Sequence, residues 1–130
     1  MNPEDDSSRK TTVLVVDDDP VCLYVVSRAL EDQGFGVICA KGGEEALEIC
    51  LDESRIIDAV LTDVFMPDLG GMELAAKLKE LRPKTAFIFM TGYLNKVVNL
   101  HWQHGHQLIS KPVNPAYLRD MIDIQINVII

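Results

Sequence analysis

Short apolar runs alternate along the chain with segments whose apolar residues recur at helical spacing. The runs are rich in β-branched residues, which favour buried strands. They span residues 12–17, 35–40, 59–63, 85–91 and 107–111. The pattern between and after them predicts helices over residues 20–34, 43–53, 72–81, 94–103 and 115–130. Each predicted strand is therefore followed by a predicted helix.

This alternation indicates the fold class. Parallel strands joined by helical crossovers form a sheet that is covered by helices on both faces. Right-handed crossovers then give a doubly wound α/β fold with a five-stranded parallel sheet and five helices. The 130 residues fit one domain, which we expect over residues 11–130. Residues 1–10 are charged and rich in serine, and we expect a flexible tail there.

Composition and charge point to an acidic protein with an aliphatic core. The hydrophobic fraction is 48%, whereas aromatic residues make up 6%. A formal net charge of −8 argues against direct binding of nucleic acid or an anionic membrane, since both would repel this surface. No apolar run is long enough to span a bilayer and the polar start is no signal peptide, so we expect a soluble, cytoplasmic protein. Cys22, Cys39 and Cys50 lack metal-ligand spacing, and we expect small buried residues there.

Residues able to do chemistry follow the predicted strands. In open α/β sheets the functional site lies outside the carboxyl ends of the strands. The residues at those ends are Asp17, Asp18, Asp19, Asp63, Thr91 and Lys111. Clustered carboxylates repel one another unless a cation lies among them, and carboxylate oxygens suit Mg²⁺. No set of cysteines and histidines favours zinc.

This set of residues is suited to phosphoryl transfer. A lysine ammonium, a threonine hydroxyl and a metal ion can stabilise the oxygens of a phosphoryl group in flight. The nucleophile would be a carboxylate, which would become an aspartyl phosphate. Asp63 closes an apolar strand and stands alone, with Lys111 expected opposite, so Asp63 is the candidate acceptor.

The chain resembles the receiver domain of two-component response regulators over about residues 11–130. The motifs that carry the resemblance are V-L-V-V-D-D-D-P, L-T-D-V-F-M-P-D-L-G-G, F-M-T-G and S-K-P-V, in the family's order. The resemblance implies a flavodoxin-like sheet with strand order 2-1-3-4-5. It also implies that the Lys111–Pro112 peptide bond is cis.

The resemblance also implies a role for each residue of the site. Asp63 matches the phosphorylated aspartate, and Asp17 and Asp18 match the acidic pair that holds Mg²⁺. The backbone carbonyl of Phe65 matches a further metal ligand. Thr91 matches the switch hydroxyl and Lys111 the lysine that contacts the phosphoryl group.

Members of this family are signalling domains that catalyse their own phosphorylation. The donor is a phosphohistidine on a sensor histidine kinase or a histidine phosphotransfer protein. Phosphorylation shifts a face made by the fourth helix, fifth strand and fifth helix, which implies binding to an effector domain or self-association. The closing segment, residues 122–130, is apolar on more than one face and is either such a surface or a helix that continues in a longer chain.

Three features depart from the family's pattern. Leu108 takes the place of the usual aromatic switch residue, so a coupled threonine–aromatic switch is not expected. The segment between Thr91 and Lys111 is about two residues short, and we expect an irregular fourth helix. Phe65 and Tyr93 flank the acceptor and cannot position a hydrolytic water, which predicts slow autodephosphorylation.

Two other functions fit parts of the sequence. A pseudo-receiver would keep the fold as a binding module without using phosphorylation, and Leu108 keeps this alternative open. A haloacid-dehalogenase-type phosphatase fits V-V-D-D-D-P-V formally. It requires an acidic pair at the end of a further strand, whereas only Asp120 and Asp123 follow the lysine, inside a predicted helix.

Four residues near the site have structural interpretations. Asp19 is expected to cap a helix or lie in a solvated loop. Asp68 is expected to serve the turn after the third strand. Gly70 and Gly71 are expected to supply a positive φ before the third helix.

Overall fold

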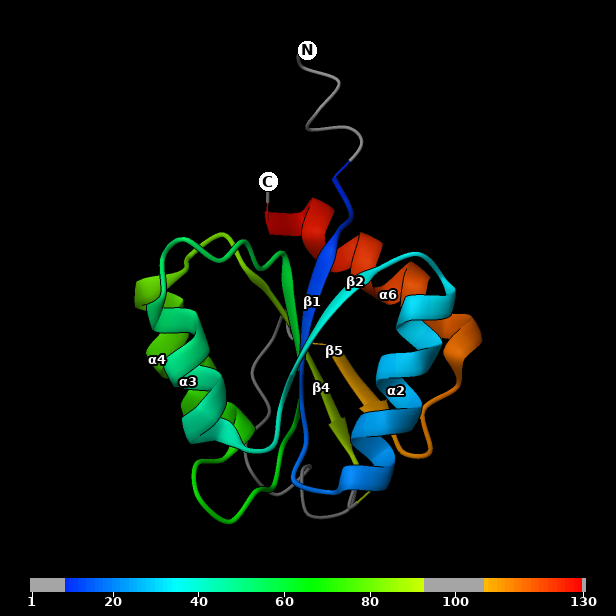
Figure 1. Cartoon of the computed structure of the whole chain (residues 1–130), viewed down its shortest axis with the longest axis horizontal. Helices are drawn as coiled ribbons and strands as arrows, with labels where there is room; N and C mark the ends of the chain where they lie inside the picture. Colours follow the sequence, from blue (N-terminus) through cyan, green and yellow to red (C-terminus); the bar gives the residue numbers. More distant parts are fainter. Residues whose placement is uncertain (1–8, 93–106, 130) are drawn as a thin grey trace.

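The computed structural model describes residues 9–92 and 107–129. Its centre is a five-stranded parallel sheet with the order β2-β1-β3-β4-β5, which confirms the expected topology (Figure 1). The strands are β1 (Thr12–Val16), β2 (Gly36–Ala40), β3 (Ala59–Asp63), β4 (Ala86–Thr91) and β5 (Gln107–Ser110).

Helices cover both faces of the sheet, as a doubly wound fold requires. They are α2 (Pro20–Asp32), α3 (Gly43–Leu51), α4 (Gly71–Leu81) and α6 (Pro115–Ile129). In Figure 1, α3 and α4 lie on one side of the sheet and α2 and α6 on the other. The described residues thus contain four of the five expected helices, and the helix predicted over residues 94–103 lies outside them.

The three central strands are buried on both faces, which explains their continuous apolar sequences. Alternate residues belong to different halves of the core. Leu14, Val60 and Phe89 pack with residues of α3 and α4. Their neighbours in sequence, such as Val15 and Leu61, pack with residues of α2 and α6.

The expectation of buried cysteines is right for one residue only. Cys50 is buried, Cys22 is partly buried and Cys39 is exposed. Cys39 lies on β2, which forms an edge of the sheet and so has a neighbouring strand on one side only. Its sulfur lies 3.0 Å from the hydroxyl oxygen of Ser27.

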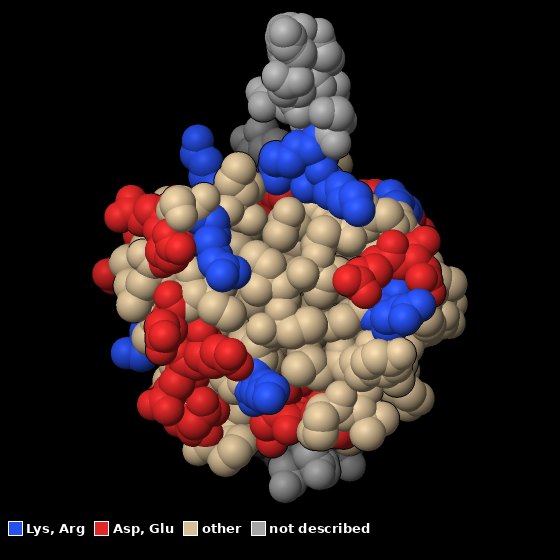
Figure 2. Space-filling model, viewed as in Figure 1, with Lys and Arg blue, Asp and Glu red and all other residues tan. Residues whose placement is uncertain are grey.

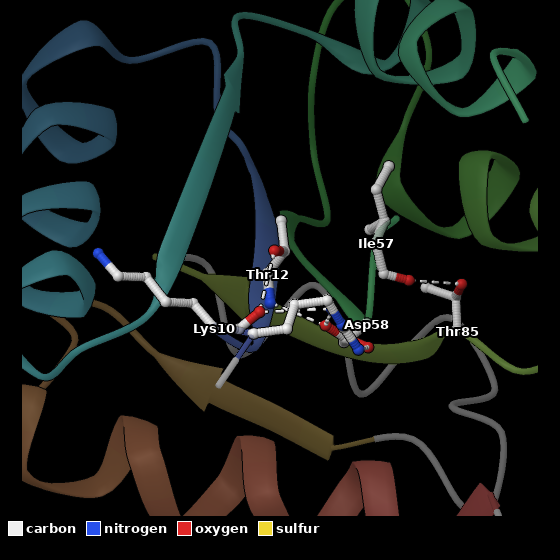
Figure 3. A network of polar contacts seen from close by, with 6 residues as sticks. Lys10, Thr12, Ile57, Asp58 and Thr85 are labelled. Carbon is white, nitrogen blue, oxygen red and sulfur yellow. Dashed lines mark hydrogen bonds and ion pairs between the residues drawn. The ribbon is translucent and has the colours of Figure 1, made fainter. Parts of the chain in front are cut away.

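A polar network joins the strands at their amino ends, the ends opposite the candidate site (Figure 3). The carboxylate of Asp58 accepts two hydrogen bonds from the guanidinium of Arg9, at 2.9 and 3.1 Å, and one from the N–H of Thr12 at 2.8 Å. Burial works to raise the pKa of Asp58, but these hydrogen bonds outweigh it and lower the pKa. Nearby, the hydroxyl of Thr85 donates to the carbonyl of Ile57. Side chains therefore support the strand pairing where β1 and β3 begin.

Candidate functional site

The carboxyl ends of the strands bring the predicted site residues to one edge of the sheet. Asp17, Asp18 and Asp63 each offer a carboxylate oxygen, and these oxygens lie within 4.8 Å of one another. Thr91 ends β4 and is fully buried. Its carbonyl accepts a hydrogen bond from the N–H of Lys111 at 2.8 Å. Acidic side chains are visible at the lower edge of the face in Figure 2, the edge toward which β1 runs.

The acidic pair is fixed where β1 turns into α2. The N–H of Asp17 donates to the carbonyl of Ala40, and one carboxylate oxygen of Asp17 accepts from the N–H of Asp19 at 2.9 Å. Asp19 in turn caps α2, because its carboxylate accepts from the N–H of Val21 at 3.0 Å. The prediction that Asp19 is a helix cap is confirmed. Asp17 is thus held inward, whereas Asp18 remains exposed to solvent.

Lys111 joins two buried carboxylates. Its ammonium nitrogen lies 2.8 Å from Oδ2 of Asp17 and 3.0 Å from Oδ2 of Asp63. Burial raises the pKa of Asp63; the hydrogen bond and charge of Lys111 oppose this, while the charge of Asp17 adds to it. Burial works to lower the pKa of Lys111, but the two carboxylates outweigh it and raise the pKa. Lys111 is therefore charged at neutral pH and offsets part of the negative charge of the site.

The donor set fits a hard divalent cation. Three carboxylates face a single ammonium group, so the cluster keeps an excess of negative charge that a cation would balance. All the clustered ligand atoms are carboxylate oxygens, which Mg²⁺ prefers. Because Asp18 is exposed, water molecules can complete the coordination from the solvent side. The residues present are therefore suited to hold Mg²⁺.

The loop after Asp63 reaches back to its carboxylate. The N–H of Phe65 donates a hydrogen bond to the side chain of Asp63 and thereby helps to orient it. This contact was not predicted. The expected cis peptide bond between Lys111 and Pro112 is confirmed.

The expected role of Gly70 and Gly71 is wrong. Gly70 has a φ of −67°, and among the described residues the one glycine with a positive φ is Gly34. Instead, Gly71 is required because a Cβ atom there would collide with the backbone carbonyl of Asp63. Its N–H donates to the carbonyl of Val64 at 2.9 Å. The start of α4 therefore lies directly against the end of β3.

Asp68 does more than the turn chemistry expected of it. Its two carboxylate oxygens accept hydrogen bonds from the N–H groups of Gly43 and Glu44, at 3.3 and 3.1 Å, at the start of α3. The residue at the N-cap of α3, Gly42, has no side chain to cap the helix. The segment G-G-E-E, residues 42–45, places a glycine at the N-cap of α3 and so offers no capping side chain. This was the available signal that another residue must cap the helix.

Cys22 is a second residue that sequence reasoning missed. It lies in the first turn of α2, and its thiol makes a hydrogen bond with Asp17. Burial, followed by the hydrogen bond and charge of Asp17, raises the pKa of this thiol to about 12. The thiol is therefore protonated at neutral pH and is no nucleophile.

Two further expectations concern residues near the end of the sheet. Leu108 is partly buried and packs against the core beside α3 and α4. Tyr93, expected to flank the acceptor, lies outside the described residues.

No described helix combines the length and hydropathy that a membrane span requires.

Comparison with known proteins agrees with the fold. Residues 13–123 match the response regulator receiver domain family, and the chain belongs to this family. The sensor kinase CckA of Brucella abortus is 39% identical over 88 residues, which cover 68% of this chain and 9% of that protein. The transcriptional regulatory protein AruR of Pseudomonas aeruginosa is 34% identical over 113 residues, which cover 82% of this chain and 45% of that protein.

A solved structure gives the same assignment. The crystal structure of a CheY-like response regulator receiver domain protein from Methanospirillum hungatei is 32% identical, with a TM-score of 0.78. The match covers 93% of this chain and 97% of that one. The curated relatives are much longer, since the chain spans less than half the length of CckA and of AruR.

Proposed function

We propose that Asp63 accepts a phosphoryl group from a phosphohistidine on a sensor histidine kinase or histidine phosphotransfer protein. The observation that carries the proposal is the meeting of Asp17, Asp63 and Lys111 at one buried point, with Asp18 on the solvent side. Mg²⁺ would be held by the three carboxylates and by the backbone carbonyl of Phe65. We expect the domain to act in the cytoplasm.

The proposed transfer forms and breaks one bond. A carboxylate oxygen of Asp63 bonds to phosphorus as the bond between phosphorus and the donor nitrogen breaks, and the electron pair leaves with the imidazole. Mg²⁺, when bound, supplies charge stabilisation for the equatorial oxygens of the phosphoryl group. Lys111 would bind one of these oxygens, because its ammonium nitrogen already lies 3.0 Å from Oδ2 of Asp63. The hydroxyl of Thr91 would bind another.

The donor would approach beside α2. A groove of about 580 Å³ runs along this helix and includes Asp17, Asp18 and Tyr24 in its lining. Val21, Tyr24 and Val25 expose apolar side chains on the same helix. An apolar surface next to the acceptor suits a helical partner that must bring a phosphohistidine to Asp63.

The output surface would lie at the end of β5 and on α6, which covers the same side of the sheet as α2. Thr91 and Lys111 are joined by a backbone hydrogen bond, so a movement at Thr91 reaches the end of β5 directly. Beyond it, α6 exposes Tyr117 and Ile124. We assign this region to self-association or to contact with an effector domain. Phe65 supplies no group to hold a hydrolytic water, and we expect the phosphorylated form to decay slowly.

The pseudo-receiver remains the second candidate because Leu108, a core aliphatic residue, replaces the usual aromatic switch. The intact mass of the protein after incubation with acetyl phosphate and Mg²⁺ separates the two functions. We expect the mass of one phosphoryl group in the parent protein, none in Asp63→Asn, and loss of the signal when Mg²⁺ is chelated. A folded parent protein that gains no mass would support the binding module instead.

A further inference from the structure

The loop over residues 64–70 contacts the acceptor directly. The N–H of Phe65 donates to the carboxylate of Asp63. Under the proposed function, the carbonyl of the same residue is a ligand of Mg²⁺. The position of Phe65 therefore affects both the orientation of the acceptor oxygen and the geometry of the metal site.

Three contacts anchor this loop. At its start, the N–H of Val64 donates to the carbonyl of Met90 at 3.0 Å. At its end, the N–H of Gly71 donates back to the carbonyl of Val64. Between these points, the side chain of Asp68 leaves the loop and binds two N–H groups of α3.

The contact between Asp68 and α3 is closely fitted. A Cβ atom on Gly42 would lie 2.7 Å from Oδ2 of Asp68, and one on Gly43 would collide with the carbonyl of Leu69. The N–H of Glu44, with further backbone N–H groups, lowers the pKa of Asp68. Asp68 is therefore ionised at neutral pH, and its negative charge faces the positive end of the helix.

We infer that Asp68 is a positioning residue for the phosphoacceptor site. It ties the middle of the loop to α3 and thereby holds Phe65 where its N–H reaches Asp63. Asp68 lies on the α3 side of the loop and acts through Phe65, without contact to the phosphoryl group. The inference rests on the proposed function, because it assigns Phe65 to the metal site.

The test compares Mg²⁺ binding in three variants by isothermal titration calorimetry. We expect Asp68→Ala to raise the Mg²⁺ dissociation constant about tenfold, the lower end of what outer partners of metal ligands contribute. Asp68→Asn should show a smaller rise, because its amide oxygen still accepts one N–H. Asp52→Ala is the matched control, since Asp52 accepts the N–H and hydroxyl of Ser54 beyond the other end of α3. It should leave Mg²⁺ binding unchanged.

The thermal midpoint separates positioning from simple capping. A lower midpoint with unchanged Mg²⁺ affinity in Asp68→Ala would overturn the inference, because Asp68 would then only stabilise α3. If Asp68→Ala does not fold, Asp68→Asn decides by the same criterion. Failure of the parent protein to accept phosphate would refute the proposed function, whereas unchanged Mg²⁺ binding in the Asp68 variants would refute this inference alone.

Discussion

Lys111 reaches from the end of β5 to Asp63 at the end of β3, with its ammonium nitrogen 3.0 Å from Oδ2 of that carboxylate. The two strands are not neighbours, because β4 lies between them. The same nitrogen lies 2.8 Å from Oδ2 of Asp17, the residue that follows β1. One side chain thus connects three strand ends, and it does so at the residue proposed to accept the phosphoryl group.

Replacing Lys111 should slow phosphorylation strongly. Lys111→Met removes the cation placed to stabilise the phosphoryl oxygens, and loss of one such donor costs about 100-fold or more in rate. The measurement is the initial rate of phosphoprotein formation from acetyl phosphate at saturating Mg²⁺. Lys77→Met, on the exposed surface of α4, is the control and should keep the parent rate. Equal rates in both variants would remove Lys111 from the mechanism.

Asp63→Asn should stabilise the protein when Mg²⁺ is absent. The pKa of Asp63 is raised in the folded state, chiefly by burial, so the folded state binds this proton more tightly than the unfolded state does. Stability from this group is present below the unfolded pKa and is lost as pH rises through the folded pKa. At pH 7 the substitution should add about 1 kcal/mol to the free energy of unfolding in urea. A less stable variant would contradict the view that the ionised carboxylate is costly there.

The titration of Asp63 can be observed directly. In metal-free protein, the ¹³C shift of its carboxyl carbon should change at a pH above the ordinary aspartate range of about 3.9, because burial raises the pKa. The carboxyl of Asp68 should titrate below that range, because the N–H of Glu44 lowers its pKa. Added Mg²⁺ should move the midpoint of Asp63 downward. The reverse order of the two midpoints would refute this description of the site.

Gly71→Ala should destabilise the fold and disturb the site together. The added methyl group would collide with the carbonyl of Asp63, so the end of β3 or the start of α4 must move, at a cost of about 2 kcal/mol or more. Gly92→Ala is the matched control, because the nearest described atom to a Cβ there, on Lys111, would lie at 4.0 Å. Urea unfolding of both variants measures the difference. Equal stabilities would show that the contact at Gly71 is readily relaxed.

The polar network around Asp58, at the amino ends of the strands, should affect stability without affecting phosphorylation. Asp58→Ala leaves the N–H of Thr12 without its side-chain acceptor and should cost about 1–2 kcal/mol. Arg9→Ala removes only an exposed partner and should cost less than about 1 kcal/mol. Urea unfolding gives the two values, and the rate of phosphorylation serves as the control. A larger loss in the Arg9 variant would contradict the assigned order.

The sequence predicted those features that depend on local pattern. The strands were recognisable because their apolar runs are buried on both faces, and Asp63 stood out because it closes such a run. The strand order came with the family resemblance and is confirmed by the structure. Parallel strands end at one edge, which is why Asp17, Asp63 and Lys111 meet although they are distant in sequence.

Features that depend on contacts between distant segments were missed. Asp68 caps a helix that begins 25 residues earlier in the chain. Local turn preferences predicted only its role in the turn and could not reveal this distant contact. Gly71 is required by the approach of the Asp63 carbonyl, which no φ preference reveals. Cys39 is exposed because β2 lies at the sheet edge, and the burial of a strand residue depends on that position.

Reductive trapping of the phosphorylated protein tests the central claim most directly. Borohydride reduces an acyl phosphate to an alcohol with release of phosphate, so a phosphorylated Asp63 becomes homoserine. Peptide sequencing by mass spectrometry, after treatment with acetyl phosphate and Mg²⁺, should find homoserine at position 63 and aspartate there when the phosphodonor is omitted. Homoserine at another aspartate, or a stable phosphate on a serine or histidine, would contradict the assignment of Asp63 as the phosphoacceptor.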